Sequence, residues 1–320
     1  MPPRQRPFAQ VDVFTATPYL GNPLAVVLDG TDLSEAQMRQ FAAWTNLSET
    51  TFVLPPTPEG AAAGADYRVR IFTPESELPF AGHPTLGTCH AWLQAGHQPR
   101  QQGVVVQECG VGLVTIGRRQ GHWAFAAPSL RRSAPDAAYL QAVLQALGVA
   151  SAQMQAVQML DNGPHWLGLL LDNPETVLAL QPDHAALRAL HAFVGVAALY
   201  PHEESSSPGL IGRSNREARA FVQPSGQRPS DARSGNADLP HLEVRAFVGE
   251  VGVSEDPVTG SLNASLAQWL IADGHLPERY TAAQGTCLNR AGRVFLERDP
   301  HGQVWVGGHS VTCIQGTASI

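Results

Sequence analysis

The chain has 320 residues, 43% of them hydrophobic and 15% charged, which is typical of a folded protein with room for two domains. A net charge of -7 with no basic stripe argues against a nucleic-acid partner. No apolar run reaches the roughly 18 residues of a membrane span. The first residues also lack the apolar stretch of a signal peptide, so we expect no membrane partner and a cytoplasmic location.

All 21 basic residues are arginine, and this excludes two classes of enzyme. Pyridoxal-phosphate enzymes need a lysine for their Schiff base, and P-loop proteins need one for their phosphates. No glycine fingerprint of a dinucleotide site follows a strand. The cysteines form no CxxC pair and no metal-ligand spacing with the histidines. They are Cys89, Cys109, Cys287 and Cys313. We expect reduced thiols, leave a disulfide open, and expect neither cofactor nor metal.

In chain order, short strands alternate with a few helices. A helix at 34–44 has Ser34 as its N-cap, and another at 139–147 ends at Gly148. A third helix is predicted at 182–193. Strands are predicted at 10–14, 24–28, 49–55, 66–74, 103–108, 112–118, 165–172, 194–201, 242–249, 292–299 and 303–317. The segment 203–240, rich in Ser, Pro, Gly, Arg and Asn, is predicted to be a mobile surface insertion.

Two stretches resemble each other: "VRIFTPESELPFAGHPTLGT" from Val69 and "VRAFVGEVGVSEDPVTGS" from Val244. With a two-residue gap the matched pairs are Phe72–Phe247, Glu75–Glu250, Pro84–Pro257, Gly87–Gly260 and Thr88–Ser261. Each copy reads as strand, loop and helix. A repeat spaced by half the chain predicts two similar domains.

The repeated turn places a polar residue before a proline, which suits the first helical position. Asp256 is a good N-cap, so capping alone could explain it. His83 is a poorer cap and needs another role. Glycine in a first helical turn costs about 1 kcal/mol against alanine, and is accepted where something approaches the backbone. Two helix N-termini facing across a cleft would bind a small carboxylate, with His83 and Asp256 as proton-transfer groups.

Glu49, in "NLSETTF", lies where a helix ends and a strand begins. A solvated glutamate is the usual case there. It could instead lie in a dry cleft, where burial raises the pKa of a carboxyl and suits it to acid–base catalysis.

Five segments resemble the PhzF-like (phenazine-biosynthesis) isomerase family: "VDVFTATPYLGNPLAVV", "NLSETTFV", "FAGHPTLGT", "EDPVTGS" and "VWVGGHSVTCIQG". The resemblance implies the α+β fold of diaminopimelate epimerase, two similar domains that each wrap a β-barrel-like sheet around a central helix. We expect domains at 1–128 and 129–310, with a last strand at about 311–320 that can return to the first domain.

The resemblance also implies a cofactor-independent isomerase and a homodimer. The family's type reaction isomerises trans-2,3-dihydro-3-hydroxyanthranilate by moving a proton. Its catalytic residues correspond to Glu49, the proton shuttle, and to His83, Asp256 and Ser261. We expect the residues at the two helix starts to bind the small carboxylate substrate. These are Gly82, Thr85, Thr259 and Gly260.

Racemases on this fold use two opposed cysteines, but neither "PFAGHP" nor "SEDPVTG" contains one. An epimerase with carboxyl and imidazole bases remains an alternative, as does a non-catalytic metabolite-binding protein. Three titratable groups at one site favour catalysis. The departures from the family pattern at Asn289, Ala291 and the segment 203–240 leave the substrate open.

Overall fold

A computed structural model describes residues 3–201, 239–249 and 254–320. Its residues up to 200 and from 240 onward form one compact unit. The predicted insertion at 203–240 lies outside the described residues except for its last two positions, and Glu250 of the repeat lies outside as well.

The elements of the first part of the chain alternate as the sequence predicts, with a few short additions. They are β1 (Gln5–Val13), β2 (Asn22–Val27), α1 (Glu35–Thr45), β3 (Thr50–Leu54), α2 (Pro58–Ala62), β4 (Tyr67–Phe72), β5 (Glu77–Leu78), α3 (Gly82–Gln94), β6 (Val104–Cys109), β7 (Gly112–Arg119) and β8 (His122–Ala126). Ser34 caps α1 through a capping box, which confirms its predicted role.

The rest of the chain contains β9 (Arg131–Ser133), α4 (Ala137–Leu147), η1 (Ser151–Gln153), β10 (Met154–Asp161), β11 (His165–Leu171), α5 (Pro174–Ala179), α6 (His184–Ala189), β12 (Phe193–Leu199), β13 (Leu242–Val248), β14 (Glu255–Asp256), α7 (Gly260–Ala272), β15 (Arg279–Gln284), η3 (Thr286–Leu288), β16 (Gly292–Arg298), β17 (Val304–Gly308) and β18 (Ser310–Ser319). Helix α4 ends at Gly148 in the left-handed conformation, as predicted.

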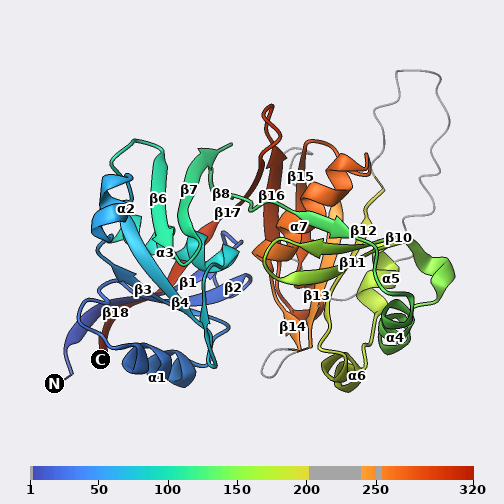
Figure 1. Cartoon of the computed structure of the whole chain (residues 1–320), viewed down its shortest axis with the longest axis horizontal. Coiled ribbons are helices and arrows are strands. Elements are labelled where there is room, and N and C mark those ends of the chain that lie inside the picture. Colours follow the sequence, from blue (N-terminus) through green and yellow to red (C-terminus); the bar gives the residue numbers. More distant parts are fainter. Residues whose placement is uncertain (1–2, 202–238, 250–253) are drawn as a thin grey trace, which may run out of the picture. The chain divides into compact units, whose positions relative to one another are not determined.

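Strand pairing repeats through the fold. One series runs β18–β1–β2–β3–β4–β6–β7–β8, and a second runs β9–β10–β11–β12–β13–β15–β16–β17. Corresponding pairs have the same direction, with the third and fifth pairs parallel and the others antiparallel. The antiparallel pair β8–β17 joins the two series. The last strand, β18, returns to pair with β1, the N-terminal strand (Figure 1). The domain boundaries at 128 and about 310 stay a prediction.

Helices α3 and α7 lie at the centre of the two series (Figure 1). Nearly every residue of both helices is buried, including Leu86, Trp92 and Trp269. A helix that is buried on all sides must be small or apolar all round, and the sequences "GHPTLGTCHAWLQ" and "GSLNASLAQWLIA" meet this requirement.

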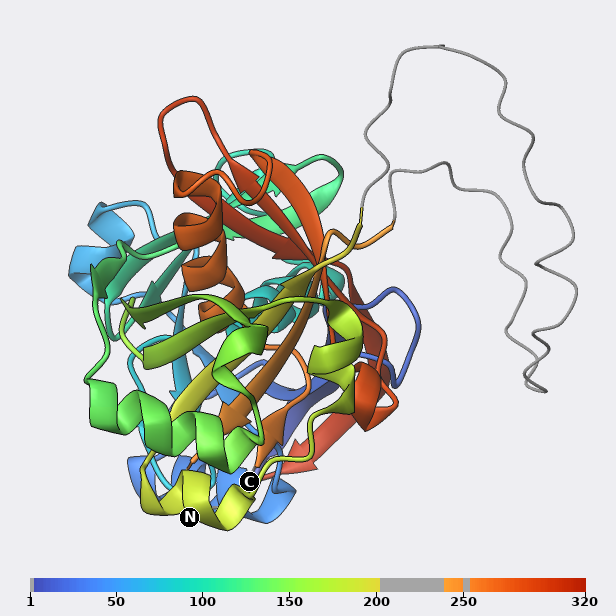
Figure 2. The same ribbon diagram turned by 90° about the vertical axis from the view of Figure 1, so that its right-hand side faces the viewer.

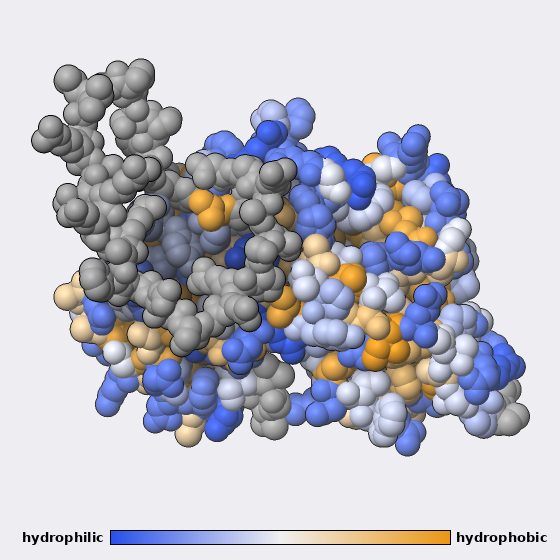
Figure 3. All heavy atoms as spheres, turned by 180° about the vertical axis from the view of Figure 1, so that it is seen from behind, coloured by the Kyte–Doolittle hydropathy of each residue, from blue (hydrophilic) through white to orange (hydrophobic). Residues whose placement is uncertain are grey.

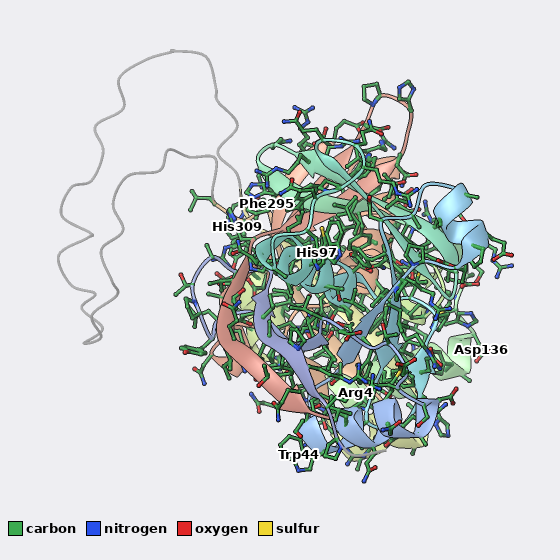
Figure 4. The ribbon with its side chains drawn as sticks, turned by 90° about the vertical axis from the view of Figure 1, so that its left-hand side faces the viewer. Arg4, Trp44, His97, Asp136, Phe295 and His309 are labelled. Atoms are coloured by element: carbon green, nitrogen blue, oxygen red, sulfur yellow. The ribbon has the colours of Figure 1, made fainter. Side chains whose placement is uncertain are left out.

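The remaining larger helices cover the outer faces of the strands. Met38 and Ala42 of α1 pack on Phe52 and Phe72. Helices α4, α5 and α6 cover the outer face of β11 to β13 and appear at the front of Figure 2. Trp44 of α1 points outward (Figure 4) and is 79% exposed. On the face shown in Figure 3, hydrophilic residues are interspersed with small hydrophobic patches. Among the described residues, no helix has the length and apolar character required to cross a membrane.

The C-terminal stretch predicted as one strand breaks at His309. Gly308 lies against Phe14, where an added Cβ would approach the ring to 2.5 Å. The His309 ring contacts Phe295 with centroids 5.8 Å apart (Figure 4). The chain turns there because β17 pairs with β8, whereas β18 must reach β1.

Two details of the predicted repeat are wrong. Helix α7 begins at Gly260 with Thr259 as N-cap, so Asp256 is not the cap and Pro257 is not the first helical residue. Helix α3 begins at Gly82, which puts His83 and Pro84 inside its first turn. The two copies align differently in the structure because a two-residue strand precedes each helix. Glu77 of β5 and Glu255 of β14 hold equivalent ladder positions in these strands.

Gly82 is therefore the structural equivalent of Gly260, and the two helix starts meet at these glycines. A Cβ added at Gly260 would lie 3.1 Å from the Cα of Gly82 and 3.3 Å from the amide nitrogen of His83. A Cβ at Gly82 would lie 2.8 Å from the Phe125 ring. Gly87 instead packs on Leu24, which an added Cβ would approach to 2.6 Å. Only the first two glycines serve the approach of the helix ends.

We predict that Gly260→Ala destabilises the protein by about 1–3 kcal/mol, because the added methyl group must push two backbones apart. Gly316→Ala is the matched control, since nothing lies within 4 Å of the Cβ it would add. Urea unfolding of the two variants measures the difference. Equal stabilities would show that the contact between the helix starts tolerates a side chain.

Candidate active site

Glu49 and His83 meet at the point where the two central helices begin. Glu49 lies between the left-handed residue Asn46, which ends α1, and the first residue of β3. His83 is the second residue of α3 and is 4% exposed. Glu49 Oε2 lies 3.4 Å from His83 Nε2, and the Glu49 side chain is 15% exposed. Neither atom has a hydrogen-bond partner among the described residues.

Burial controls the charge of both groups. It raises the pKa of Glu49 to about 8, with a further contribution from the negative charge of Asp256. It lowers the pKa of His83 to about 3, against a smaller opposing effect of a hydrogen bond to Pro23. At neutral pH the contact therefore joins a carboxylic acid and a neutral imidazole. It is not an ion pair.

The two ring nitrogens of His83 face different groups. Nδ1 lies 3.4 Å from the Asn22 amide nitrogen, and Nε2 lies 3.4 Å from Glu49 Oε2. The tautomer of the neutral ring sets which of the two nitrogens donates and which accepts.

Asn22 links this pair to Asp256. Its Nδ2 atom donates to Asp256 Oδ1 and to the Val258 carbonyl, both at 2.9 Å, and lies 3.4 Å from His83 Nδ1. Asn22 is fully buried at the start of β2, whereas Asp256 lies within the second copy of the repeat. One amide thus holds residues from both copies in one cluster.

Asp256 has an environment different from that of Glu49. Thr259 Oγ1 donates to Asp256 Oδ2 at 2.6 Å. Burial raises the pKa of Asp256 to about 6, and the hydrogen bonds from Thr259 and Asn22 oppose a larger rise. At pH 7 Asp256 is mainly ionised while Glu49 is mainly protonated.

Gln284 completes the support of Asp256. Its Nε2 atom donates to the Asp256 carbonyl at 3.0 Å and to Thr259 Oγ1 at 2.9 Å. Its Oε1 atom accepts from the Thr259 amide at 3.0 Å and from Asn263 at 2.8 Å. All polar atoms of this amide are used within the protein, which fixes the N-cap of α7.

Of the other predicted residues, Ser261 lies at the meeting of the two helices and Thr85 lies in the core. Ser261 follows Gly260 at the meeting of the helices, and its hydroxyl oxygen accepts a hydrogen bond from Trp166 at 3.3 Å, which leaves its own hydrogen for another acceptor. Thr85 is buried and its hydroxyl group donates to Ala81 and accepts from Gln107, so it supports α3 from within the core.

The backbone of the two helix starts favours an anion. Intrahelical hydrogen bonds begin at the amides of Thr85 and Asn263. The N–H groups of Gly82, Gly260 and Ser261 precede them, at the positive end of each helix. This arrangement is suited to a carboxylate.

Within the described parts of the chain, no His, Cys, Asp and Glu side chains gather as a metal site. All four cysteines are free thiols. Cys89 is buried inside α3, where burial holds the pKa of its thiol far above the usual range. A pair of opposed thiols at the helix starts is absent among the described residues.

Sequence reasoning missed Asn22 and Gln284. A signal existed for Asn22, since it lies between Gly21 and Pro23 directly before an apolar strand, a position where an unpaired amide would be costly. Gln284 ends a strand that the sequence did not predict, so no local pattern indicates its role.

The model of the phenazine biosynthesis-like protein family (PhzC-PhzF) matches residues 11–316. The protein called Antisense-enhancing sequence 1 of Schizosaccharomyces pombe is 33% identical over 330 residues, covering 98% of each chain. The trans-2,3-dihydro-3-hydroxyanthranilate isomerase of Pseudomonas aeruginosa is 29% identical, covering 97% of this chain and 98% of its own. The solved structure of a PhzF-family phenazine biosynthesis protein of Bacillus anthracis shares the fold, with a TM-score of 0.75 at 19% identity, covering 99% of this chain and 100% of that one. The chain therefore belongs to the phenazine biosynthesis-like family, with a diaminopimelate epimerase-like α+β fold, and is an isomerase of the PhzF type.

Proposed function

We propose that the protein isomerises a small carboxylate by proton transfer without a cofactor, as a reaction similar to the one named for the Pseudomonas aeruginosa relative. The observation that supports this best is the cluster of Glu49, His83 and Asp256, held together by Asn22 at the meeting of two helix starts. We also propose that the protein is a homodimer. A sedimentation mass of one 34.2 kDa chain would contradict that part.

The substrate carboxylate binds at the first-turn amides of α3 and α7, beside Gly82 and Gly260. The absence of Cβ atoms there lets the two helix ends approach each other. The amides of the two first turns then lie close together, at the positive ends that favour an anion. The hydroxyl hydrogen of Ser261 is a further donor. A bound anion offsets the positive helix ends, and this leaves burial as the main influence on the Glu49 carboxyl.

Glu49 carries the proton. At neutral pH it starts as the acid, protonates one carbon of the substrate and becomes a carboxylate. It then removes a proton from a second carbon and returns to its starting state, so that protons balance over the cycle. His83 Nε2 orients the acid, and the Asp256 carboxylate disfavours the negative charge on Glu49.

An epimerase with two bases is the second candidate, because Glu49 precedes a strand of the first series, Asp256 lies in the second copy of the repeat, and the pKa values of both lie near neutrality. Product analysis in D2O separates the two. Isomerisation moves a double bond, whereas epimerisation exchanges one hydrogen and inverts its carbon.

We predict that Glu49→Gln lowers kcat by about 100- to 10,000-fold, because the amide keeps the shape of the side chain but cannot carry the proton. Turnover of trans-2,3-dihydro-3-hydroxyanthranilate measures this effect. Glu59→Gln, an exposed glutamate in α2, is the matched control and should leave kcat unchanged. If Glu49→Gln stays within a few-fold of the parent chain, Asp256 or His83 carries the proton instead.

The rate should follow a bell-shaped pH profile with a maximum between about pH 6 and about pH 8. Below this range Asp256 takes up a proton, and above it Glu49 loses the proton that it must donate. Initial rates from pH 4 to 10 provide the profile. A rate that still rises above pH 9 would exclude Glu49 as the starting acid.

Stability should depend on pH through Glu49 even without a substrate. Its folded pKa of about 8 exceeds the ordinary value of 4.5, so its contribution is intact below about pH 4.5 and is lost as the pH rises through 8. Between pH 5 and pH 9 the parent chain should lose about 2–4 kcal/mol more stability than Glu49→Gln. Denaturant unfolding at both pH values measures the difference. Parallel losses in the two proteins would mean that Glu49 titrates normally.

A further inference from the structure

The two copies of the repeat contain the same arginine–glutamate pair. Arg70 on β4 binds Glu77 on β5 through two contacts, Nε to Oε1 at 2.7 Å and Nη2 to Oε2 at 2.6 Å. Arg245 on β13 binds Glu255 on β14 in the same way, at 2.9 and 2.8 Å. The two pairs are equivalent by position and by geometry.

Each arginine also lies on a phenylalanine of its own strand. The guanidinium carbon of Arg70 is 5.0 Å from the Phe72 ring centre, and that of Arg245 is 4.8 Å from the Phe247 ring centre. Both arginines are thereby fixed against one face of a strand. The glutamate that each one binds fixes the neighbouring two-residue strand.

The pairs differ in burial and in the residue that comes after the glutamate. The side chains of Arg70 and Glu77 are 25% and 31% exposed, whereas those of Arg245 and Glu255 are 6% and 8% exposed. After Glu77 the chain continues with Leu78. After Glu255 it continues with Asp256, the carboxylate of the candidate active site.

Side chains alternate along a strand, so Glu255 and Asp256 point to opposite faces of β14. The outer side chain is bound to Arg245, and the inner one reaches Asn22 and Thr259. Among the described residues, β14 pairs with β13 at two ladder positions, and a backbone hydrogen bond from Val248 to Ser254 adds to them. Arg245 also donates to the carbonyls of Val177 and Leu180 at the end of α5, which ties it to a second element.

We propose that the Arg245–Glu255 ion pair is a positioning device for the reaction: it sets the backbone of β14 so that Asp256 faces Asn22, Thr259 and Glu49. Neither Arg245 nor Glu255 touches the substrate. The kinetic consequence rests on the proposed function, whereas the placement of Asp256 does not.

Glu49 can report the placement of Asp256 without any substrate. The groups that act on the Glu49 carboxyl are His83, at 3.4 Å, and the charge of Asp256, which raises its pKa. Asp256 itself faces Asn22, Thr259, Gln284 and, along its own strand, Glu255. If β14 shifts, Asp256 moves away from Glu49 and the pKa of Glu49 falls.

The experiment is a pH titration of 13C-labelled glutamate carboxyls by NMR, with the Glu49 signal assigned from Glu49→Gln. In Glu255→Gln we expect the Glu49 midpoint to fall by about 0.5–1 pH unit, as it should in Asp256→Asn. The double variant Glu255→Gln/Asp256→Asn should shift it no further than Asp256→Asn alone. Glu77→Gln, the same change in the other copy, should leave the midpoint unchanged.

In the kinetic arm, Glu255→Gln should lower kcat by about 10- to 100-fold with KM within about twofold, because the proton-transfer geometry changes while the carboxylate site remains. A folded Glu255→Gln with the parent midpoint overturns the proposal. If the parent chain does not turn over trans-2,3-dihydro-3-hydroxyanthranilate, the proposed function fails alone and the titration still decides. If Glu255→Gln does not fold, Arg245→Lys, which keeps both charges but loses the two-pronged contact, must lower the midpoint, and an unchanged midpoint overturns the proposal.

Discussion

The contact between Gly82 and Gly260 is the constraint on which the site depends. Each helix begins beneath a short strand, and the missing Cβ atoms let the two first turns come within van der Waals distance. Both helix ends are positive, so their approach is unfavourable unless a negative group lies between or beside them. Asp256 and a bound carboxylate meet that requirement. The same geometry that concentrates positive potential therefore creates the binding site.

Burial then determines how protons are distributed among the three titratable groups. A site open to water would leave Glu49 ionised and His83 partly charged at neutral pH. In this structure desolvation neutralises both, while two hydrogen bonds keep most of Asp256 ionised. The pKa values of the two carboxyls differ because hydrogen-bond donors reach only one of them. Asp256 receives hydrogen bonds from Asn22 and Thr259, whereas Glu49 Oε2 receives none among the described residues.

Several helix ends and the three titratable residues of the candidate site could be predicted from the sequence, because short local motifs indicate them. Ser34 and Gly148 indicated helix ends, and the turn motifs led to Glu49, His83 and Asp256. The first residues of the two central helices could not be predicted, because the prolines that resemble each other in sequence hold different places once the two-residue strands β5 and β14 form. Long-range partners such as Gln284 were also beyond reach. Its role depends on the pairing of β15 with β13, which no short stretch encodes.

The two copies of the fold are alike in backbone and different in chemistry, and this difference explains how one site arises from a repeat. At the position after the paired glutamate, the first copy has Leu78 and the second has Asp256. At the position after the helix-start glycine, the first has His83 and the second has Ser261. A symmetric site with two aspartates would place like charges together and force one to stay protonated. The asymmetric set lets one copy supply the imidazole and Asn22, and the other the charged carboxylate that Asn22 binds. Because Asn22 makes this connection across the repeat, the asymmetry also holds the two copies together at the place where the reaction is proposed to occur.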